Sequence, residues 1–242
     1  MTNNDNTAKP LQQKFTVERF SLSEGSITEE DIEKMVKLSI RAFESARDKD
    51  GDLSQDAVLG RDWSLAPVYF RYIIRLGLLA DAIYGVRDIQ TNEIVALGIW
   101  FGPGSLDSKF QELKESRRAA GLYDFLNGLQ PQFKEWYEHD LLELIRQREE
   151  LFTEEERSRR WWCIHLCTEP QYHGRGLARS IIDNIHEQAR NTVQGGFVAL
   201  AAGVKVNARK YQSLGFQERG LLRAPVPDNS GKDFLSYVLS RE

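Results

Sequence analysis

Residues 166–178 constrain the fold more than any other segment, because they place two glycines between a strand and a helix. An apolar run at residues 161–164 predicts the strand, and an amphipathic pattern beyond the turn predicts the helix. Gly174 and Gly176 carry no Cβ, so a ligand can approach the backbone of the turn closely. The first N–H groups of the helix and its dipole then point at one spot, which suits a pyrophosphate.

The glycine turn matches neither of two common phosphate-binding patterns. No Gly-x-x-x-x-Gly-Lys-Ser/Thr motif occurs, and no third glycine completes a dinucleotide-binding fingerprint. Residues 166–178 (LCTEPQYHGRGLA) instead resemble the acetyl-CoA loop of the GCN5-related N-acetyltransferases, and residues 210–216 (KYQSLGF) are similar to a second signature of that family. The plain alternative is a helix N-terminus followed later by a glycine cap. The resemblance covers residues 160–220, and elsewhere it rests on element order.

The pattern of the whole chain fits the fold that this resemblance implies, an α/β (α+β) fold. We expect a mixed, mostly antiparallel central sheet flanked by helices, with a helical insertion at about 105–158 between strands 3 and 4. Residues 1–13 are expected to be a disordered tail, and residues 14–242 a single N-acetyltransferase domain. A helical hairpin packed on the sheet and a substrate lid are the two interpretations of the insertion. Strands are predicted at 15–20, 82–88, 94–101, 161–168, 196–202, 216–219 and 233–239. Helices are predicted from a cap at Ser26 or Thr28 to residue 47, and at 67–79, 177–189 and 204–214.

Composition excludes several classes of function. The chain has 242 residues and a formal net charge of −4, which disfavours a nucleic-acid binder. No run of 18 apolar residues predicts a transmembrane helix, and the polar first residues lack the apolar core of a signal peptide. We therefore expect a cytoplasmic protein with no membrane and no nucleic-acid partner. A homodimer is compatible with the sequence.

The two cysteines, Cys163 and Cys167, lie on the strand before the glycine turn. Their even spacing predicts that both face the same side of that strand, ~13 Å apart and too far to form a disulfide. Their spacing does not fit a metal site either, so we expect buried thiols and no bound metal.

The resemblance implies acetyl-CoA as donor and CoA as product. The pyrophosphate would sit on backbone N–H groups of His173, Gly174, Arg175, Gly176, Leu177 and Ala178. The pantetheine arm would pair with the backbone of Leu166, Cys167 and Thr168. The family pattern [QR]-x-x-G-x-[GA] fits in two registers, from Gln171 or from His173, and we prefer the second because it keeps both glycines where the family has them.

The second signature implies a catalytic tyrosine. Tyr211 corresponds to the family's general acid, which protonates the leaving thiolate, and a phenol is protonated at neutral pH. Many members have asparagine seven residues before this tyrosine, where this chain has Val204; Asn207 is the candidate to take over that cofactor contact. Lys205, Arg209 and Lys210 are candidate contacts for the 3′-phosphate of the cofactor, and the alternative is a solvated basic helix face.

The general base is not defined by the sequence. His165 on the central strand and Glu169 at its end are the two candidates, and a water relay is an equal alternative. His139 and Asp140 in the insertion are further candidates for a substrate pocket. Cys167 as an acyl-enzyme nucleophile is disfavoured because no base is evident beside it.

We therefore expect an acyl-CoA-dependent acetyltransferase that moves acetyl to the amine of a small molecule by direct transfer in a ternary complex. The amine acceptor is implied by the family. An aromatic set would suit an apolar or aromatic amine: Tyr69, Tyr72, Trp100, Trp136 and Tyr137. The alternatives are a peptide or protein acceptor, and a non-catalytic acetyl-CoA-binding module that regulates a partner.

Overall fold

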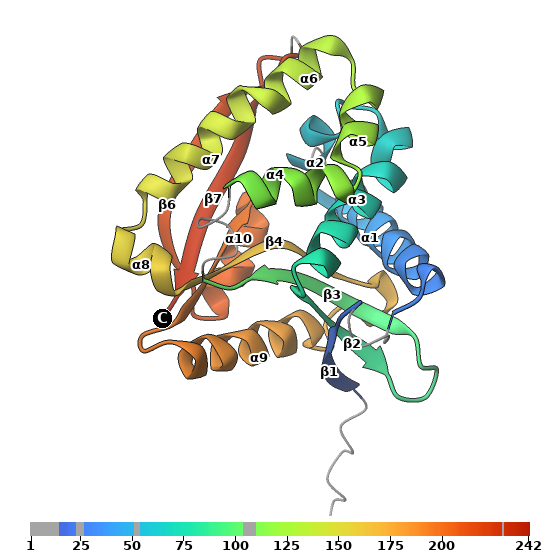
Figure 1. The fold of residues 1–242 in the computed structure, drawn as a ribbon, viewed down its shortest axis with the longest axis vertical. Coiled ribbons are helices and arrows are strands. Elements are labelled where there is room, and N and C mark those ends of the chain that lie inside the picture. Colours follow the sequence, from blue (N-terminus) through green and yellow to red (C-terminus); the bar gives the residue numbers. More distant parts are fainter. Residues whose placement is uncertain (1–14, 23–26, 51–53, 104–109, 229) are drawn as a thin grey trace, which may run out of the picture.

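A computed structural model describes residues 15–22, 27–50, 54–103, 110–228 and 230–242 (Figure 1). The predicted tail at residues 1–13 lies outside them. The order of the predicted elements is confirmed, with the short helix α2 in addition. The elements are β1 (Phe15–Phe20), α1 (Glu29–Asp50), α2 (Ser54–Val58), η1 (Trp63–Leu65), α3 (Ala66–Leu79), β2 (Ile83–Asp88), β3 (Ile94–Phe101), α4 (Phe110–Ala119), α5 (Leu122–Gly128), α6 (Pro131–Glu138), α7 (Asp140–Glu150), α8 (Glu154–Arg159), β4 (Arg160–Thr168), η2 (Pro170–Tyr172), α9 (Leu177–Thr192), β5 (Phe197–Ala202), α10 (Lys205–Ser213), β6 (Gln217–Pro225) and β7 (Asp233–Arg241).

Within the described residues, seven strands form one sheet in the order β1-β2-β3-β4-β5-β7-β6. Only β4 and β5 run parallel, and every other pair of neighbours is antiparallel. The helix α9 makes the crossover that parallel neighbours require. The predicted mixed, mostly antiparallel sheet is therefore confirmed.

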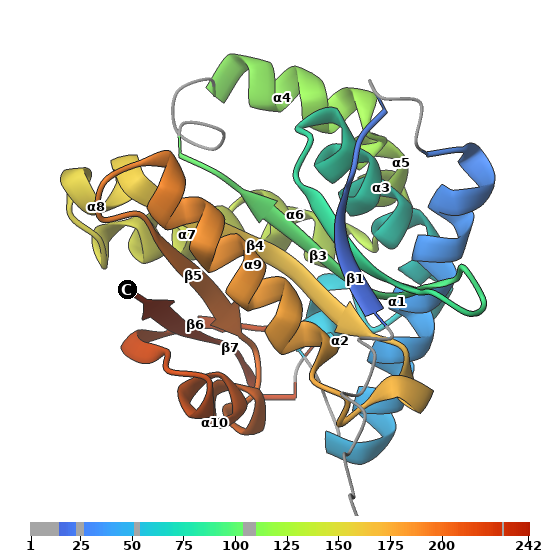
Figure 2. The same ribbon diagram turned by 90° about the horizontal axis from the view of Figure 1, so that it is seen from below.

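Helices cover both faces of the sheet because each carries an apolar stripe (Figure 2). On one face α1 and α3 pack against β3, and α1 begins where Thr28 and Asp31 cap each other through 3.1 Å and 3.2 Å hydrogen bonds. On the other face α9 crosses β1 to β5. The stripe of α9 is fully buried and consists of Leu177, Ile181, Ile182, Ile185 and Ala189.

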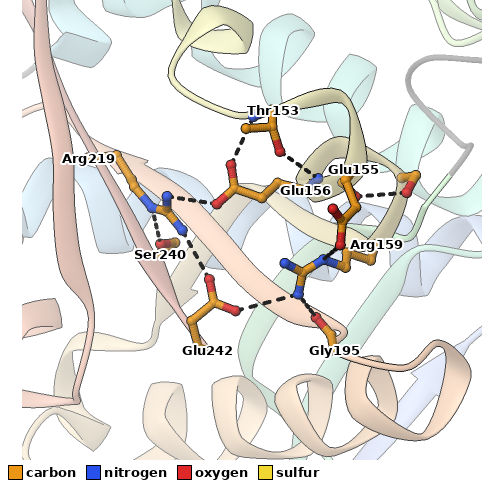
Figure 3. A network of polar contacts seen from close by, with 9 residues as sticks. Thr153, Glu155, Glu156, Arg159, Gly195, Arg219, Ser240 and Glu242 are labelled. Atoms are coloured by element: carbon orange, nitrogen blue, oxygen red, sulfur yellow. Dashed lines mark hydrogen bonds and ion pairs between the residues drawn. The ribbon is translucent and has the colours of Figure 1, made fainter.

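The insertion between β3 and β4 is helical, as predicted, and its described part comprises α4 to α8. Figure 1 shows α6 and α7 running above β6 and β7 before α8 leads into β4. A polar network fastens this end to the sheet (Figure 3). Arg219 of β6 holds Glu156 of α8 at 2.8 Å, donates to Ser240 Oγ at 2.7 Å, and contacts Glu242 at 3.0 Å. These contacts favour the first interpretation of the insertion, a helical hairpin packed on the sheet, over a substrate lid.

None of the helices in the described part of the chain combines the length and the apolarity needed to cross a membrane.

Candidate functional site

The strands β4 and β5 separate half-way along their length. Their parallel pairing ends at Cys163 and Leu200, although β4 continues to Thr168 and β5 to Ala202. The separation leaves one edge of the second half of β4 without a neighbouring strand. An unpaired edge of this kind presents backbone N–H and C=O groups that an extended ligand can bond.

The pairing with β3 shows which groups of β4 face the gap. The N–H of Glu169 donates to the carbonyl of Val95 at 2.9 Å, and the antiparallel register places Thr168 beside Ala96. Because bonded and non-bonded pairs alternate in an antiparallel ladder, the backbone of Cys167 bonds β3 while Leu166 and Thr168 turn toward the gap. The prediction that all three residues offer backbone groups is therefore wrong for Cys167.

A β-bulge lies at the same place. In the β3–β4 register His165 pairs with Ile99 and Cys163 with Trp100, so Ile164 is an extra residue without a partner. The extra residue inverts the alternation of side chains. Cys163 packs in the cluster under α9, whereas Cys167 packs in the cluster under α1. The prediction of both thiols on one face is wrong for this reason, and both are free and buried.

The glycine turn has a left-handed backbone conformation at both of its glycines. Gly174 and Gly176 both have φ of +78°, the left-handed region that glycine adopts without strain, and a Cβ on either would meet no protein atom within 4 Å. Gly176 is the N-cap of α9 and its side of the turn is exposed. In this described segment, the N–H groups of Gly174, Gly176, Leu177 and Ala178 have no protein acceptor. They fit an anionic group.

His173 connects the turn to the open strand edge. Its Nε2 lies 3.0 Å from the carbonyl oxygen of Thr168, one of the groups that face the gap. The glycine turn and the open edge of β4 therefore form one continuous polar surface. Arg175, also in the turn, lies over the ring of Tyr172 at 4.6 Å.

A cavity of about 370 Å³ lies beside the bulge and reaches into the insertion. The opened strands contribute Ile164, Leu166 and Ala201 to its wall, and α10 contributes Asn207 and Tyr211. The other walls are apolar and aromatic side chains from α1, α3, β7 and the insertion. They include Phe43, Tyr69, Tyr72, Tyr137, Leu141, Leu144, Ile145 and Phe234.

Tyr211 lies in the wall of this cavity near the strand gap. Its ring packs edge-on against Phe216 with 5.8 Å between centroids, and its hydroxyl bonds no described residue. Burial raises the pKa of the phenol well above its ordinary value. Tyr211 is therefore a protonated, unpartnered donor at neutral pH. Asn207 also lines the cavity, and it accepts a 3.1 Å bond from the exposed Lys210.

His165 lines the cavity from the α1 side. Its ring stacks on Phe43 at 5.5 Å, and its Nε2 is 3.0 Å from Ser39 Oγ. The Ser39 hydroxyl also bonds the carbonyl of Met35 at 2.9 Å, which can only accept. We therefore infer that the Ser39 hydroxyl donates to the Met35 carbonyl and that Nε2–H of His165 donates to Ser39 Oγ. This tautomer leaves Nδ1 of His165 with a free lone pair. Burial lowers the pKa of His165 to about 3, so the ring stays neutral.

The other predicted polar residues lie elsewhere. Glu169 does not line the cavity. Its carboxylate accepts hydrogen bonds from Nε of Arg41 at 3.1 and 3.0 Å and from Nη2 of Arg41 at 2.6 Å. This bidentate pair argues against Glu169 as the base. His139 and Asp140 are exposed and outside the cavity wall. Of the five predicted aromatic residues, Trp100 and Trp136 are core residues, whereas the three tyrosines line the cavity.

Sequence reasoning missed Arg117, which enters the cavity wall from α4. Nothing in the local pattern of that charged helix distinguishes Arg117 from its exposed neighbour Arg118. It also missed Arg148, which lies in the wall from α7 and stacks on Trp162 at 4.1 Å.

No family model matches the chain, and no curated protein matches it significantly. Solved structures do match it over almost its whole length. Arylalkylamine N-acetyltransferase 2 from Aedes aegypti is 15% identical, with 94% of this chain and 98% of that chain covered and a TM-score of 0.57. A putative arylalkylamine N-acetyltransferase 7 from the same mosquito is 16% identical, with 93% and 86% covered and a TM-score of 0.56.

The chain has the fold of the GCN5-related N-acetyltransferases. A Drosophila melanogaster polyamine N-acetyltransferase, described as forming N-acetylagmatine, shares this acetyltransferase fold at 13% identity, with 93% and 97% covered and a TM-score of 0.50. At these identities the likeness establishes the acetyltransferase fold and leaves the chemistry to the residues of the site.

Proposed function

We propose that this chain is an acetyl-CoA-dependent N-acetyltransferase that acetylates the amine of a small molecule by direct transfer in a ternary complex. The observation that carries the proposal is the sequence of three adjoining features. An open strand edge begins where β4 and β5 separate, a glycine turn with free N–H groups follows the end of that edge, and a cavity with an unpartnered phenol lies beside the edge.

The residues present fit acetyl-CoA. The N–H groups at 174 and 176–178 would hold its pyrophosphate, and the backbone of Leu166 and Thr168 would bond its pantetheine arm as an added strand. The N–H groups of His173 and Arg175 donate to the carbonyls of Pro170 at 3.2 Å and Tyr172 at 3.4 Å, so these two residues would shape the turn rather than bind the pyrophosphate through their N–H groups. Asn207 is placed to contact the arm from α10, and Lys210, exposed and bonded to Asn207, would contact the outer phosphate.

The cavity would hold the acceptor. Its volume of about 370 Å³ lies in the range of small-molecule sites, and its aromatic lining suits an apolar amine. The solved structures of similar fold include enzymes named for arylalkylamines, which is consistent with such an acceptor. We therefore favour a small molecule over a peptide or protein acceptor.

The reaction needs two proton movements. Acetyl-CoA supplies the acetyl group as a thioester, whose carbon–sulfur bond breaks as the carbon–nitrogen bond to the amine forms. Tyr211 would give its phenolic proton to the departing sulfur. His165 Nδ1 would accept a hydrogen bond from the attacking amine or from a relay water. A pKa near 3 makes this ring too weak a base to keep the proton, so we assign its removal to a relay of waters that passes the amine proton to bulk solvent, from which Tyr211 regains the proton that it gave to the sulfur.

The first experiment is calorimetric titration with acetyl-CoA and CoA, followed by an assay of thiol release with a panel of amines. Micromolar binding of acetyl-CoA and release of CoA that requires an amine would support the proposal. Binding without turnover on any amine would instead favour a non-catalytic acetyl-CoA-binding module. Failure to bind either nucleotide would refute both functions.

A further inference from the structure

The wall of the cavity carries positive charge and, among the described residues that line it, no acidic side chain. Among the described residues that line it there are two arginines, Arg117 and Arg148, and no aspartate or glutamate. A carboxylate would be the expected partner for an acceptor with a second cationic group, such as a polyamine. The charge of this cavity therefore opposes such an acceptor.

Arg148 is held by the protein itself. Its guanidinium donates twice to Glu149, at 3.0 and 2.8 Å, and stacks on Trp162. Glu149 is shared, because Arg160 also bonds it. The carboxylate of Glu149 is thus shared by Arg148 and Arg160, and it is not a partner of Arg117.

Arg117 has no such partner. Its guanidinium makes no hydrogen bond and no ion pair with any residue that the structure describes, and its Nε is buried without an acceptor. A guanidinium whose Nε is buried without an acceptor is unfavourable, because that part of the group loses water and gains no compensating contact. Such a group is suited to an anion that arrives with a ligand.

Two phenols complete the surroundings of Arg117. Burial raises the pKa of Tyr72 and of Tyr137, and the positive charge of Arg117 opposes this rise in both, which places the guanidinium near the two hydroxyls. Both tyrosines line the cavity and stay protonated. The two phenols hydrogen-bond each other, so the guanidinium and one phenolic O–H remain as donors for an acidic group.

This cluster lies away from the reacting end of the cavity. Arg117 comes from α4 and Tyr211 from α10, and Figure 2 shows these two helices well separated, α4 at the top of the view and α10 at the bottom. An acceptor whose amine lies near Tyr211 would therefore extend its other end toward Arg117.

We propose that the acceptor is an amine with an apolar or aromatic body whose far end carries a carboxylate, and that Arg117 binds this carboxylate. The inference rests on the proposed function for the amine end, and on the unpartnered arginine for the acid end. The proposed acid end disfavours acceptors that carry a second positive charge.

The test compares three acceptors of one shape: 4-(2-aminoethyl)benzoate, 2-phenylethylamine and 4-(2-aminoethyl)benzylamine. We expect kcat/KM for the benzoate to exceed that of 2-phenylethylamine by about 10- to 100-fold, the range of a charge-assisted hydrogen bond, and the diamine to be the poorest. In Arg117→Met the ratio of benzoate to 2-phenylethylamine should fall to about 1 through KM. Arg117→Lys should retain part of the ratio, and the control Arg118→Met, on the exposed side of α4, should retain all of it.

Binding of 4-ethylbenzoate, which has no amine, measures the recognition of the carboxylate separately from acetyl transfer. Calorimetry should show tighter binding to the wild type than to Arg117→Met, with unchanged melting temperatures. Equal binding to both proteins, or equal kcat/KM for the three amines, would overturn the inference while the acetyltransferase proposal stands. Loss of acetyl-CoA binding would overturn the proposed function, whatever the result with 4-ethylbenzoate.

Discussion

Tyr172 donates a 2.9 Å hydrogen bond to Asp88, and this bond ties the glycine turn to the β2–β3 hairpin. Asp88 also accepts from the backbone N–H groups of Gln90 at 2.8 Å and Thr91 at 3.3 Å. The carboxylate is therefore fixed by the hairpin, and Tyr172 is fixed by the carboxylate. The position of the N–H groups that would bind pyrophosphate depends on a contact 84 residues away in sequence.

Removing this bond should weaken acetyl-CoA binding. Tyr172→Phe keeps the ring and deletes the hydroxyl, so the turn would have to be ordered at the moment of binding. We expect the Kd for acetyl-CoA to rise roughly 3- to 10-fold, with kcat nearly unchanged. Calorimetry of this variant beside Tyr123→Phe, at an exposed position on α5, measures the effect. An identical Kd in the two variants would show that the bond does not organise the turn.

The glycine turn allows a matched comparison with a second glycine. Gly176 and Gly231 have φ of +78° and +67°, and neither would bring a new Cβ against protein atoms. Gly176→Val and Gly231→Val should therefore lose similar stability, at least about 1 kcal/mol, through backbone strain alone. Only Gly176→Val should lose acetyl-CoA binding, by more than 10-fold, because its side chain would stand where the ligand approaches. Tight binding by Gly176→Val would remove the turn from the site.

Tyr211→Phe should slow turnover without weakening cofactor binding. A general acid contributes roughly 10²-fold or more to the rate, so we expect kcat to fall by about that factor. Because burial raises the pKa of the phenol, the wild-type rate should not decline below pH 10 through ionisation of Tyr211. Steady-state kinetics with calorimetry, and Tyr123→Phe as control, provide the measurement. Wild-type turnover in Tyr211→Phe would assign the acid elsewhere.

The parts of this fold that the sequence predicted are those with local causes. The stripe of α9, the cap of α1 and the apolar run of β3 each depend on residues a few positions apart. The glycine turn was predictable for the same reason, because Gly174 and Gly176 stand directly before an amphipathic helical pattern. Both glycines have a positive φ.

The features that sequence reasoning missed arise from contacts between distant segments. The bulge at Ile164 follows from pairing with β3, and no glycine or proline signals it within residues 160–168. It moved Cys163 and Cys167 to opposite faces. The pairing of Glu169 with Arg41 spans 128 residues, and the approach of Arg117 to Tyr72 and Tyr137 joins an insertion helix to α3. Helical periodicity gives no information about such partners.

His165 should make the stability of the fold depend on pH. Burial lowers its pKa in the folded protein to about 3, whereas the unfolded chain has the ordinary value of 6.5. Between these values the unfolded chain binds the extra proton, so stability is complete above about pH 6.5 and declines as pH falls toward 3. The loss between pH 7 and pH 5 should be about 2 kcal/mol from this group. Urea unfolding at both pH values measures it. In His165→Gln most of this pH dependence should disappear, whereas His139→Gln, at an exposed histidine, should retain it. Equal pH dependence in wild type and His165→Gln would contradict a neutral buried ring at this position.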